Sequence, residues 1–273
     1  MICKELSNKE FDSKELMFAE LKANKDFIIK TKKANIYKSC DKGVGIIAKS
    51  LRLEATKETF KDDNSYYIAV NTTNVLDSHG DLHVKGIWNK TVKEQQQQNY
   101  LLLDHKMEMG SVAVKKENVE MFLADIPFSS VGKSFAGNTQ ALIYKVSKDN
   151  VINPIAKEWL ESGDDIEASV RMQYVNVELA MNSEDKRDKA ELKTFNDNIG
   201  NIANKSDFED LTHFWVVKEA KNLGESSLVL MGSNSSTGVI EPLKDTQSIN
   251  IEDEPLKDTQ EEVEVKSKLS KRF

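Results

Sequence analysis

Serine and histidine side chains at the ends of predicted strands are the first residues in this sequence that could do chemistry. His105 follows an apolar run, and Ser169 lies near the start of a run rich in β-branched residues. A serine hydroxyl is a poor nucleophile at neutral pH, so amide hydrolysis requires a neighbouring base that removes its proton. Histidine suits this step and the later protonation of the leaving amine, because its pKa lies near neutrality. Two strands of one sheet can bring such residues together although they are far apart in sequence.

Each of these residues also has an ordinary structural interpretation. A serine on a strand is usually a polar residue on a sheet face, and a histidine after an apolar run can be a satisfied residue at the core edge. A third possibility is a metal site at 79–83, where His79, Asp81 and His83 fall within five residues and strand alternation would place all three on one face. No further His-rich motif completes a ligand set, so a metal-dependent hydrolase is the weaker hypothesis.

The elements that must position these residues can be read from the hydrophobic periodicity. Strand patterns occur at 66–75, 100–105, 111–114, 119–126, 166–177, 213–218 and 226–231. Helical spacing occurs at 87–98, 139–146 and 152–160, and within 182–210 for a surface helix with Leu192, Phe195, Ile199 and Ile202 on one face. This order predicts an α+β fold: a mostly antiparallel β-sheet or small barrel flanked by helices.

The two ends of the chain differ from its centre. Residues 1–60 are rich in Lys and Glu with short apolar runs, and we interpret them as an N-terminal extension. Residues 236–273 are polar and acidic, and the heptapeptide EPLKDTQ occurs there twice, at 241–247 and 254–260. Such a segment buries too little apolar surface to fold alone, so we predict a disordered tail. The repeat is either a duplicated linker or an element for self-cleavage or scaffold docking.

Composition limits the classes of function. The 273 residues carry a net charge of −7 with a pI near 5.3, and no basic block interleaved with aromatics occurs, so we expect no nucleic-acid partner. Cys3 and Cys40 form no C-x-x-C motif, which argues against a disulfide framework or a thiolate metal site. No run approaches the ~20 apolar residues that span a bilayer. We therefore expect a soluble protein without membrane partner, signal peptide, cofactor or metal.

Three separated sequence blocks carry a family resemblance. The blocks are 77–82 with 86–88 leading into 103–105 and 110–112, then 160–163 with 167–170, and finally 223–229. In order and spacing they resemble the signature blocks of the tailed-phage prohead (capsid maturation) serine proteases, distant relatives of herpesvirus assemblin. The resemblance covers roughly 65–235, so 61–235 is expected to be the catalytic domain. Gly232-Ser233-Asn234 departs from the family's common Pro-Ala-Asn.

The resemblance implies roles for individual residues. It places the catalytic histidine at His105 and the nucleophile at Ser169, and it makes Glu225 a candidate for the third catalytic group. That group would hold the imidazole in the required tautomer. His213, Glu219 and Asp125 remain rivals for this position. Backbone N–H groups would form the oxyanion hole, with Arg171 as a possible helper.

The expected function follows from the same resemblance. It implies an endopeptidase that cleaves the scaffold, the major capsid protein and itself inside an assembling phage head, in the cytoplasm of a bacterial host. Its partners would be those head proteins and further copies of itself as a homo-oligomer. The alternative from another class is a catalytically inactive internal scaffolding protein that acts through its acidic tail.

Overall fold

The computed structural model describes residues 1–39, 60–77, 79–162, 166–208 and 210–230, all within one compact unit, Met1–Thr237. The predicted tail at 236–273, with both copies of its repeat, lies outside the described residues. The strands are β1 (Ile2–Cys3), β2 (Lys9–Glu10), β3 (Tyr37–Ser39), β4 (Ser65–Thr72), β5 (Asp81–His83), β6 (Tyr100–Leu103), β7 (Val112–Val114), β8 (Glu120–Pro127), β9 (Asn138–Ser147), β10 (Glu167–Met181) and β11 (His213–Val229). The helices are α1 (Lys14–Ala23), α2 (Lys25–Ala34), α4 (Asn89–Glu94), α5 (Pro154–Ser162) and α6 (Lys189–Asn198).

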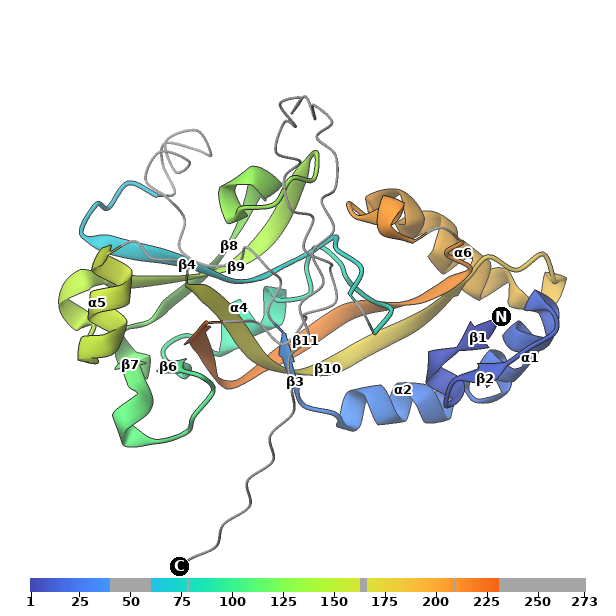
Figure 1. The fold of residues 1–273 in the computed structure, drawn as a ribbon, viewed down its shortest axis with the longest axis horizontal. Coiled ribbons are helices and arrows are strands. Elements are labelled where there is room, and N and C mark those ends of the chain that lie inside the picture. Colours follow the sequence, from blue (N-terminus) through green and yellow to red (C-terminus); the bar gives the residue numbers. More distant parts are fainter. Residues whose placement is uncertain (40–59, 78, 163–165, 209, 231–273) are drawn as a thin grey trace, which may run out of the picture. The chain divides into compact units, whose positions relative to one another are not determined.

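A six-stranded sheet forms the centre of the unit. Its order is β3-β10-β11-β6-β7, and β5 pairs with another part of β11. The pairings of β11 with β5 and β6 are parallel, and the other ladders of this sheet are antiparallel. In Figure 1 the long ladder of β10 and β11 runs between α6 near one end and the β6, β7 and α5 region near the other. β11 is therefore the strand against which most of the sheet is built.

A second sheet, β4-β9-β8, is antiparallel throughout. Tyr144 of β9 and Ile68 of β4 bury their side chains in the same core as Val170 and Trp215 of the central sheet. The expected mixed α+β fold with mostly antiparallel sheets is confirmed. The barrel alternative is wrong for the described part of the chain, because the path of the central sheet ends at β3 and β7 without closing.

Residues 1–39 of the expected N-terminal extension pack into this same core. Met17, Phe18 and Leu21 of α1 are buried in the main hydrophobic cluster, and the Ser13 hydroxyl caps that helix by accepting from the N–H of Leu16. A buried ion pair joins Lys32 of α2 to Asp81 of β5. Apolar burial and this ion pair together attach the segment to the sheet that carries the predicted site.

Two secondary-structure predictions are wrong. The segment predicted to be a helix at 139–146 is strand β9, whose successive side chains enter two clusters: Leu142 and Tyr144 pack in the main core, and Ala141 and Ile143 in the second. A strand covered on both faces has a continuous apolar run, which periodicity cannot distinguish from a helix.

The second wrong prediction concerns the strands expected at 213–218 and 226–231, because the described chain forms one strand, β11, from His213 to Val229. Gly224 has φ +84°, and β11 has extra residues between the partners of Val170 and Met172, so the polar interruption is a bulge and not a turn.

Two predicted helices are shorter than expected. The helix at 87–98 is confined to α4, and the ordered helix within 182–210 is α6, followed by short 3₁₀ turns. Of the four residues predicted to share one face, Phe195 and Ile202 are buried, and Leu192 and Ile199 are half-buried.

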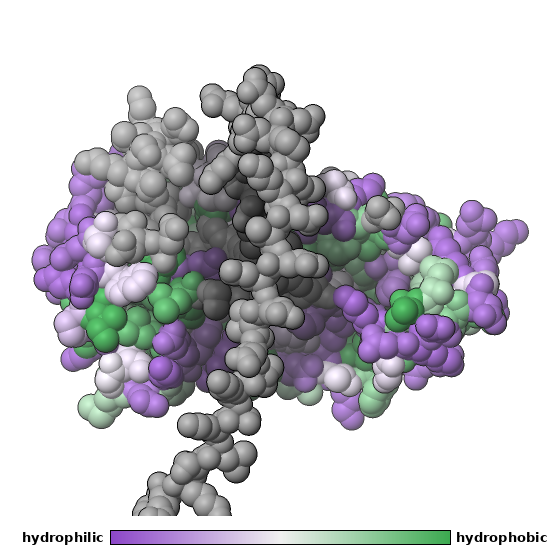
Figure 2. Space-filling model, in the orientation of Figure 1, coloured by the Kyte–Doolittle hydropathy of each residue, from purple (hydrophilic) through white to green (hydrophobic). Residues whose placement is uncertain are grey.

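The surface is mixed in character. Figure 2 shows hydrophilic side chains over much of the coloured face, with smaller groups of hydrophobic residues between them. No helix among the described residues is long and apolar enough to cross a membrane.

Candidate active site

Ser169 lies on β10, three residues into the strand, and is paired with Ser227 of β11. The residues around it, Ala168 and Val170, are fully buried, and Ser169 itself is 2% exposed. The ladder is irregular between Val170 and Met172, immediately after the serine. Bulges of this kind change the direction of side chains beside them and are common next to active sites. Here the extra residues are on β11, opposite the part of β10 that follows Ser169.

His105 reaches the same place from a turn at the end of β6. Asp104 donates its N–H to the carbonyl of Leu228 and so continues the pairing of β6 with β11. Asp104 and His105 then adopt left-handed conformations, with φ 53° and 55°. Two successive non-glycine residues with left-handed backbone conformations are unusual. Backbone strain of this kind is often concentrated at functional sites. The turn directs the His105 side chain back over β11, towards β10.

The imidazole of His105 bonds to both predicted partners. Its Nε2 lies 2.6 Å from the Oγ of Ser169, and its Nδ1 lies 2.8 Å and 3.1 Å from the two carboxylate oxygens of Glu225. With Nδ1–H donating to the carboxylate, Nε2 carries the lone pair that accepts the serine O–H. This chain of bonds places an acid, a base and a nucleophile in the order that acyl transfer requires. The structure therefore brings together all three residues that the resemblance singled out.

Glu225 is positioned by the β11 bulge. Gly224, just before it, adopts the left-handed conformation that glycine tolerates best. The side chain of Asn222 accepts the N–H of Glu225 at 3.0 Å and donates to the hydroxyl of Tyr144 at 2.6 Å. Glu225 is 0% exposed, and an isolated carboxylate in such a place would cost several kcal/mol. His105 and one further hydroxyl supply the hydrogen bonds that offset this cost.

That hydroxyl belongs to Ser227, which the sequence analysis did not single out. Its Oγ–H donates to Glu225 Oε2 at 2.9 Å, and its Oγ accepts the backbone N–H of His105 at 3.0 Å. Ser227 thus holds both the carboxylate and the strained histidine turn. The signal was present in the sequence, since residues two apart on a strand share one face and Glu225 and Ser227 have this spacing.

The rivals of Glu225 are engaged elsewhere. His213 pairs with Glu5 at 3.6 Å, Asp125 with Lys85 at 2.6 Å, and Glu219 with Lys90 at 3.6 Å. Lys218, on the same strand as Glu225, pairs with Glu178 at 2.6 Å.

Arg171, the possible oxyanion helper, lies on β10 opposite Lys38 of β3, and no contact places its guanidinium at the trio. The described structure thus identifies the acid beside His105 but not the oxyanion donors.

The segment 79–83 does not assemble the metal site considered for it. His79 is exposed, whereas the buried His83 lies 3.1 Å from the hydroxyl of Tyr174 through Nε2. Asp81 is paired with Lys32, and burial together with the neighbouring Asp81 raises the pKa of Asp77 to about 8. The Lys32–Asp81 ion pair attaches α2 to β5.

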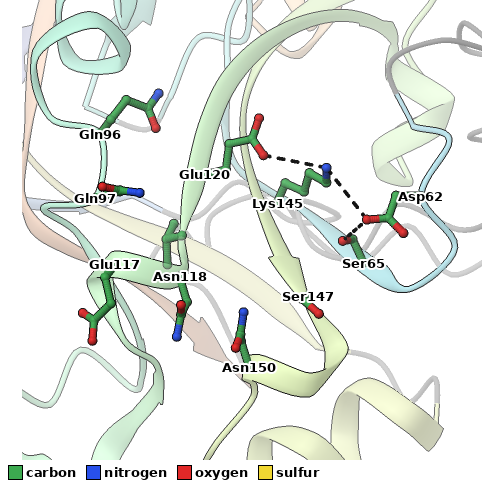
Figure 3. Close-up of a pocket in the computed structure, with 11 residues that line it drawn as sticks. Asp62, Ser65, Gln96, Gln97, Glu117, Asn118, Glu120, Lys145, Ser147 and Asn150 are labelled. Atoms are coloured by element: carbon green, nitrogen blue, oxygen red, sulfur yellow. Dashed lines mark hydrogen bonds and ion pairs between the residues drawn. The ribbon is translucent and has the colours of Figure 1, made fainter.

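The catalytic trio proposed below, Ser169, His105 and Glu225, is largely buried. Ser169 is 2% exposed and the imidazole of His105 is 7% exposed. The polar hollow in Figure 3, of about 710 Å³, is a different place: Asp62, Lys145 and Glu120 interact across one side of it, and no member of the trio lines it.

Comparisons with known proteins identify no family for this chain. No family model, no curated protein and no solved structure matches the chain significantly. The assignment of the site rests on the distances between Ser169, His105 and Glu225 and on the resemblance of the three sequence blocks.

Proposed function

We propose that this chain is a serine endopeptidase of the phage prohead type, with Ser169 as nucleophile, His105 as general base and Glu225 as the group that orients the base. One observation carries the proposal. The His105 imidazole bonds through Nε2 to Ser169 and through Nδ1 to Glu225, so that β10, the turn after β6 and β11 each supply one member of a hydrogen-bonded chain. An ordinary core histidine needs no such pairing of a serine and a buried acid.

The chemistry follows from the tautomer that these bonds select. As Ser169 Oγ attacks the carbonyl carbon of a scissile peptide, His105 Nε2 takes the hydroxyl proton, and the negative charge moves to the carbonyl oxygen. The tetrahedral intermediate collapses when the C–N bond breaks and the imidazolium returns the proton to the leaving amine. A water molecule then gives a proton to the same nitrogen as its oxygen attacks the acyl carbon, and the imidazolium returns that proton to Ser169 Oγ as the C–O bond of the acyl-serine breaks and the carboxylic acid product leaves. The carboxylate of Glu225 stabilises the imidazolium in both halves of the reaction.

Ser227 acts in this scheme as a positioning residue. It touches neither the substrate nor the reacting atoms. Its hydroxyl fixes the carboxylate of Glu225 from one side and the His105 backbone from the other. Because effective acyl transfer depends on placement within fractions of an ångström, this double contact contributes to the rate through His105.

The substrates are proposed from the resemblance: the scaffold and the N-terminal part of the major capsid protein in an assembling phage head, together with the protease's own termini. The proposed setting is the interior of a prohead in a bacterial cytoplasm.

The test is co-expression of the full chain with the neighbouring capsid protein, followed by intact-mass analysis. Wild type should shorten the capsid protein or itself, whereas Ser169→Ala and His105→Ala should leave every chain whole. Ser130→Ala is the matched control, because Ser130 is equally buried but lies in the turn after β8. Processing by Ser169→Ala would overturn the assignment, and intact chains in all samples would favour the scaffolding role.

A further inference from the structure

Cys3, Glu5 and His213 meet away from the proposed catalytic trio. Cys3 is in β1, Glu5 lies in the 3₁₀ turn Lys4–Leu6 that follows, and His213 begins β11. The thiol sulfur, one carboxylate oxygen and one imidazole nitrogen all lie within 4.8 Å of one another. This is the one such group of metal-ligand side chains among the described residues. None of the three takes part in the acyl-transfer scheme.

We propose that Cys3, Glu5 and His213 bind a zinc ion. The proposal goes beyond the protease function and does not rest on it. Zinc takes thiolate, imidazole and carboxylate ligands at about 2.0–2.3 Å in tetrahedral geometry, which separates neighbouring ligand atoms by roughly 3.5 Å. Cys3 Sγ lies 3.5 Å from Glu5 Oε2, and His213 Nε2 lies 3.6 Å from the same oxygen. These two separations fit edges of a tetrahedron around one ion.

Two further side chains orient the ligands. The hydroxyl of Thr212 lies 3.2 Å from Nδ1 of His213, which lets Nδ1–H donate and leaves the Nε2 lone pair for the metal. The indole N–H of Trp215 donates to Glu5 Oε1 at 3.0 Å, so the other carboxylate oxygen remains available. Metal-binding histidines and carboxylates commonly have such supporting hydrogen bonds.

The candidate site is open to solvent on one side. Cys3 is 0% exposed, whereas the side chains of Glu5 and His213 are 13% and 14% exposed. A water molecule from this open side would complete four-coordination, as in zinc sites with three protein ligands. The bound ion would link the first residues of the chain to the start of β11. The absence of a C-x-x-C motif predicts no thiolate metal site, but Cys3 and His213 are distant in sequence, so their approach leaves no short motif.

The experiment uses the full chain as Ser169→Ala, which prevents self-cleavage, with any affinity tag removed and a thiol reductant present. After loading with zinc and exhaustive dialysis, elemental analysis should find about one zinc per chain. Loading with cobalt(II) instead should give a thiolate-to-metal charge-transfer band and the intense visible bands of a tetrahedral site. Cys3→Ser should lose both signals, and His213→Gln should lose the tetrahedral spectrum. The control His79→Gln, which alters an exposed histidine, should retain both.

The wild-type ligand set gives the decisive readings, so the test does not depend on the folding of a variant. Zinc far below one per chain, or cobalt without a thiolate band, would overturn the proposal. Zinc retained equally by Cys3→Ser and His213→Gln, with unchanged circular dichroism, would also overturn it. Zinc should raise the melting temperature of the Ser169→Ala chain and leave that of its Cys3→Ser form unchanged, because only a folded site binds the ion.

Discussion

Replacing Glu225 by glutamine changes the charge of the buried acid and keeps its size. The carboxylate now faces Nδ1 of His105 at 2.8 Å and has no exposed surface. A glutamine amide in this place either presents its NH₂ to Nδ1, which forces the proton onto Nε2, or presents its oxygen without the negative charge. In the first case Nε2 cannot accept the proton of Ser169. In the second the imidazolium that forms during reaction lacks its counter-charge.

The size of the loss can be worked from the same distance. Two unit charges 2.8 Å apart attract by about 6 kcal/mol at an effective dielectric constant of ~20. At about 1.4 kcal/mol for each factor of ten, losing this stabilisation of the imidazolium slows acylation by roughly 10⁴-fold. The fold should survive, because the glutamine oxygen or nitrogen can still bond to the Ser227 hydroxyl, so we expect little change in melting temperature.

The assay is the rate of capsid-protein processing by Glu225→Gln, measured by intact mass over time in co-assembled heads. Glu219→Gln is the matched control on the same strand. Its carboxylate is partly exposed and faces Lys90 at 3.6 Å, so processing should stay within about twofold of wild type. If Glu225→Gln slows processing by less than about tenfold while Ser169→Ala abolishes it, the orienting role of Glu225 is wrong.

Three further changes test the surroundings of the trio and the charged cluster between α2 and β5. Ser227→Ala should lower the processing rate by about 10- to 100-fold, because a buried carboxylate oxygen of Glu225 loses its donor. The control is Ser226→Ala, which removes a hydroxyl bonded to Asn222 and not to Glu225, and it should lower the rate much less. Gly224→Ala should cost about 1 kcal/mol in urea unfolding and also slow processing, since φ +84° strains alanine beside Glu225; a variant as stable as wild type would contradict the bulge. Asp77→Asn should remove a fall in stability that wild type shows as the pH rises from about 4 to about 8. Between these pH values the carboxyl group of Asp77 keeps its proton in the folded protein, where its pKa is raised to about 8, and has lost it in the unfolded chain. If the urea midpoint changes between pH 5 and pH 8 by the same amount in wild type and in Asp77→Asn, this assignment is wrong.

The three members of the trio could be named from the sequence, but their contacts could not. Apolar and β-branched runs placed Ser169 and His105 on or beside strands, and the structure has them on β10 and just after β6. Their meeting depends on the pairing of both β10 and β6 with β11, which is long-range and leaves no local pattern. The left-handed turn at His105 was likewise unforeseen, because no glycine marks it.

Other errors have equally local causes. The bulge at Gly224 was interpreted as a break between strands, since a glycine and polar neighbours are also typical of turns. The composition of residues 1–60, rich in Lys and Glu, indicates an N-terminal extension, and gives no sign that the described part, 1–39, packs into the main core. Its few apolar residues, Met17, Phe18 and Leu21, nevertheless fall on one side of α1 and enter the main core. A small apolar stripe is enough to bury a helix whose remaining faces are charged.

The most direct measurement of the central claim is active-site labelling with a fluorophosphonate in heads co-assembled with the capsid protein, read by peptide mass spectrometry. The account predicts one adduct, on Ser169, formed in wild type and in Glu219→Gln and lost in His105→Ala. An adduct on a different serine, or labelling of Ser169 that persists undiminished in His105→Ala, would contradict activation of Ser169 by His105.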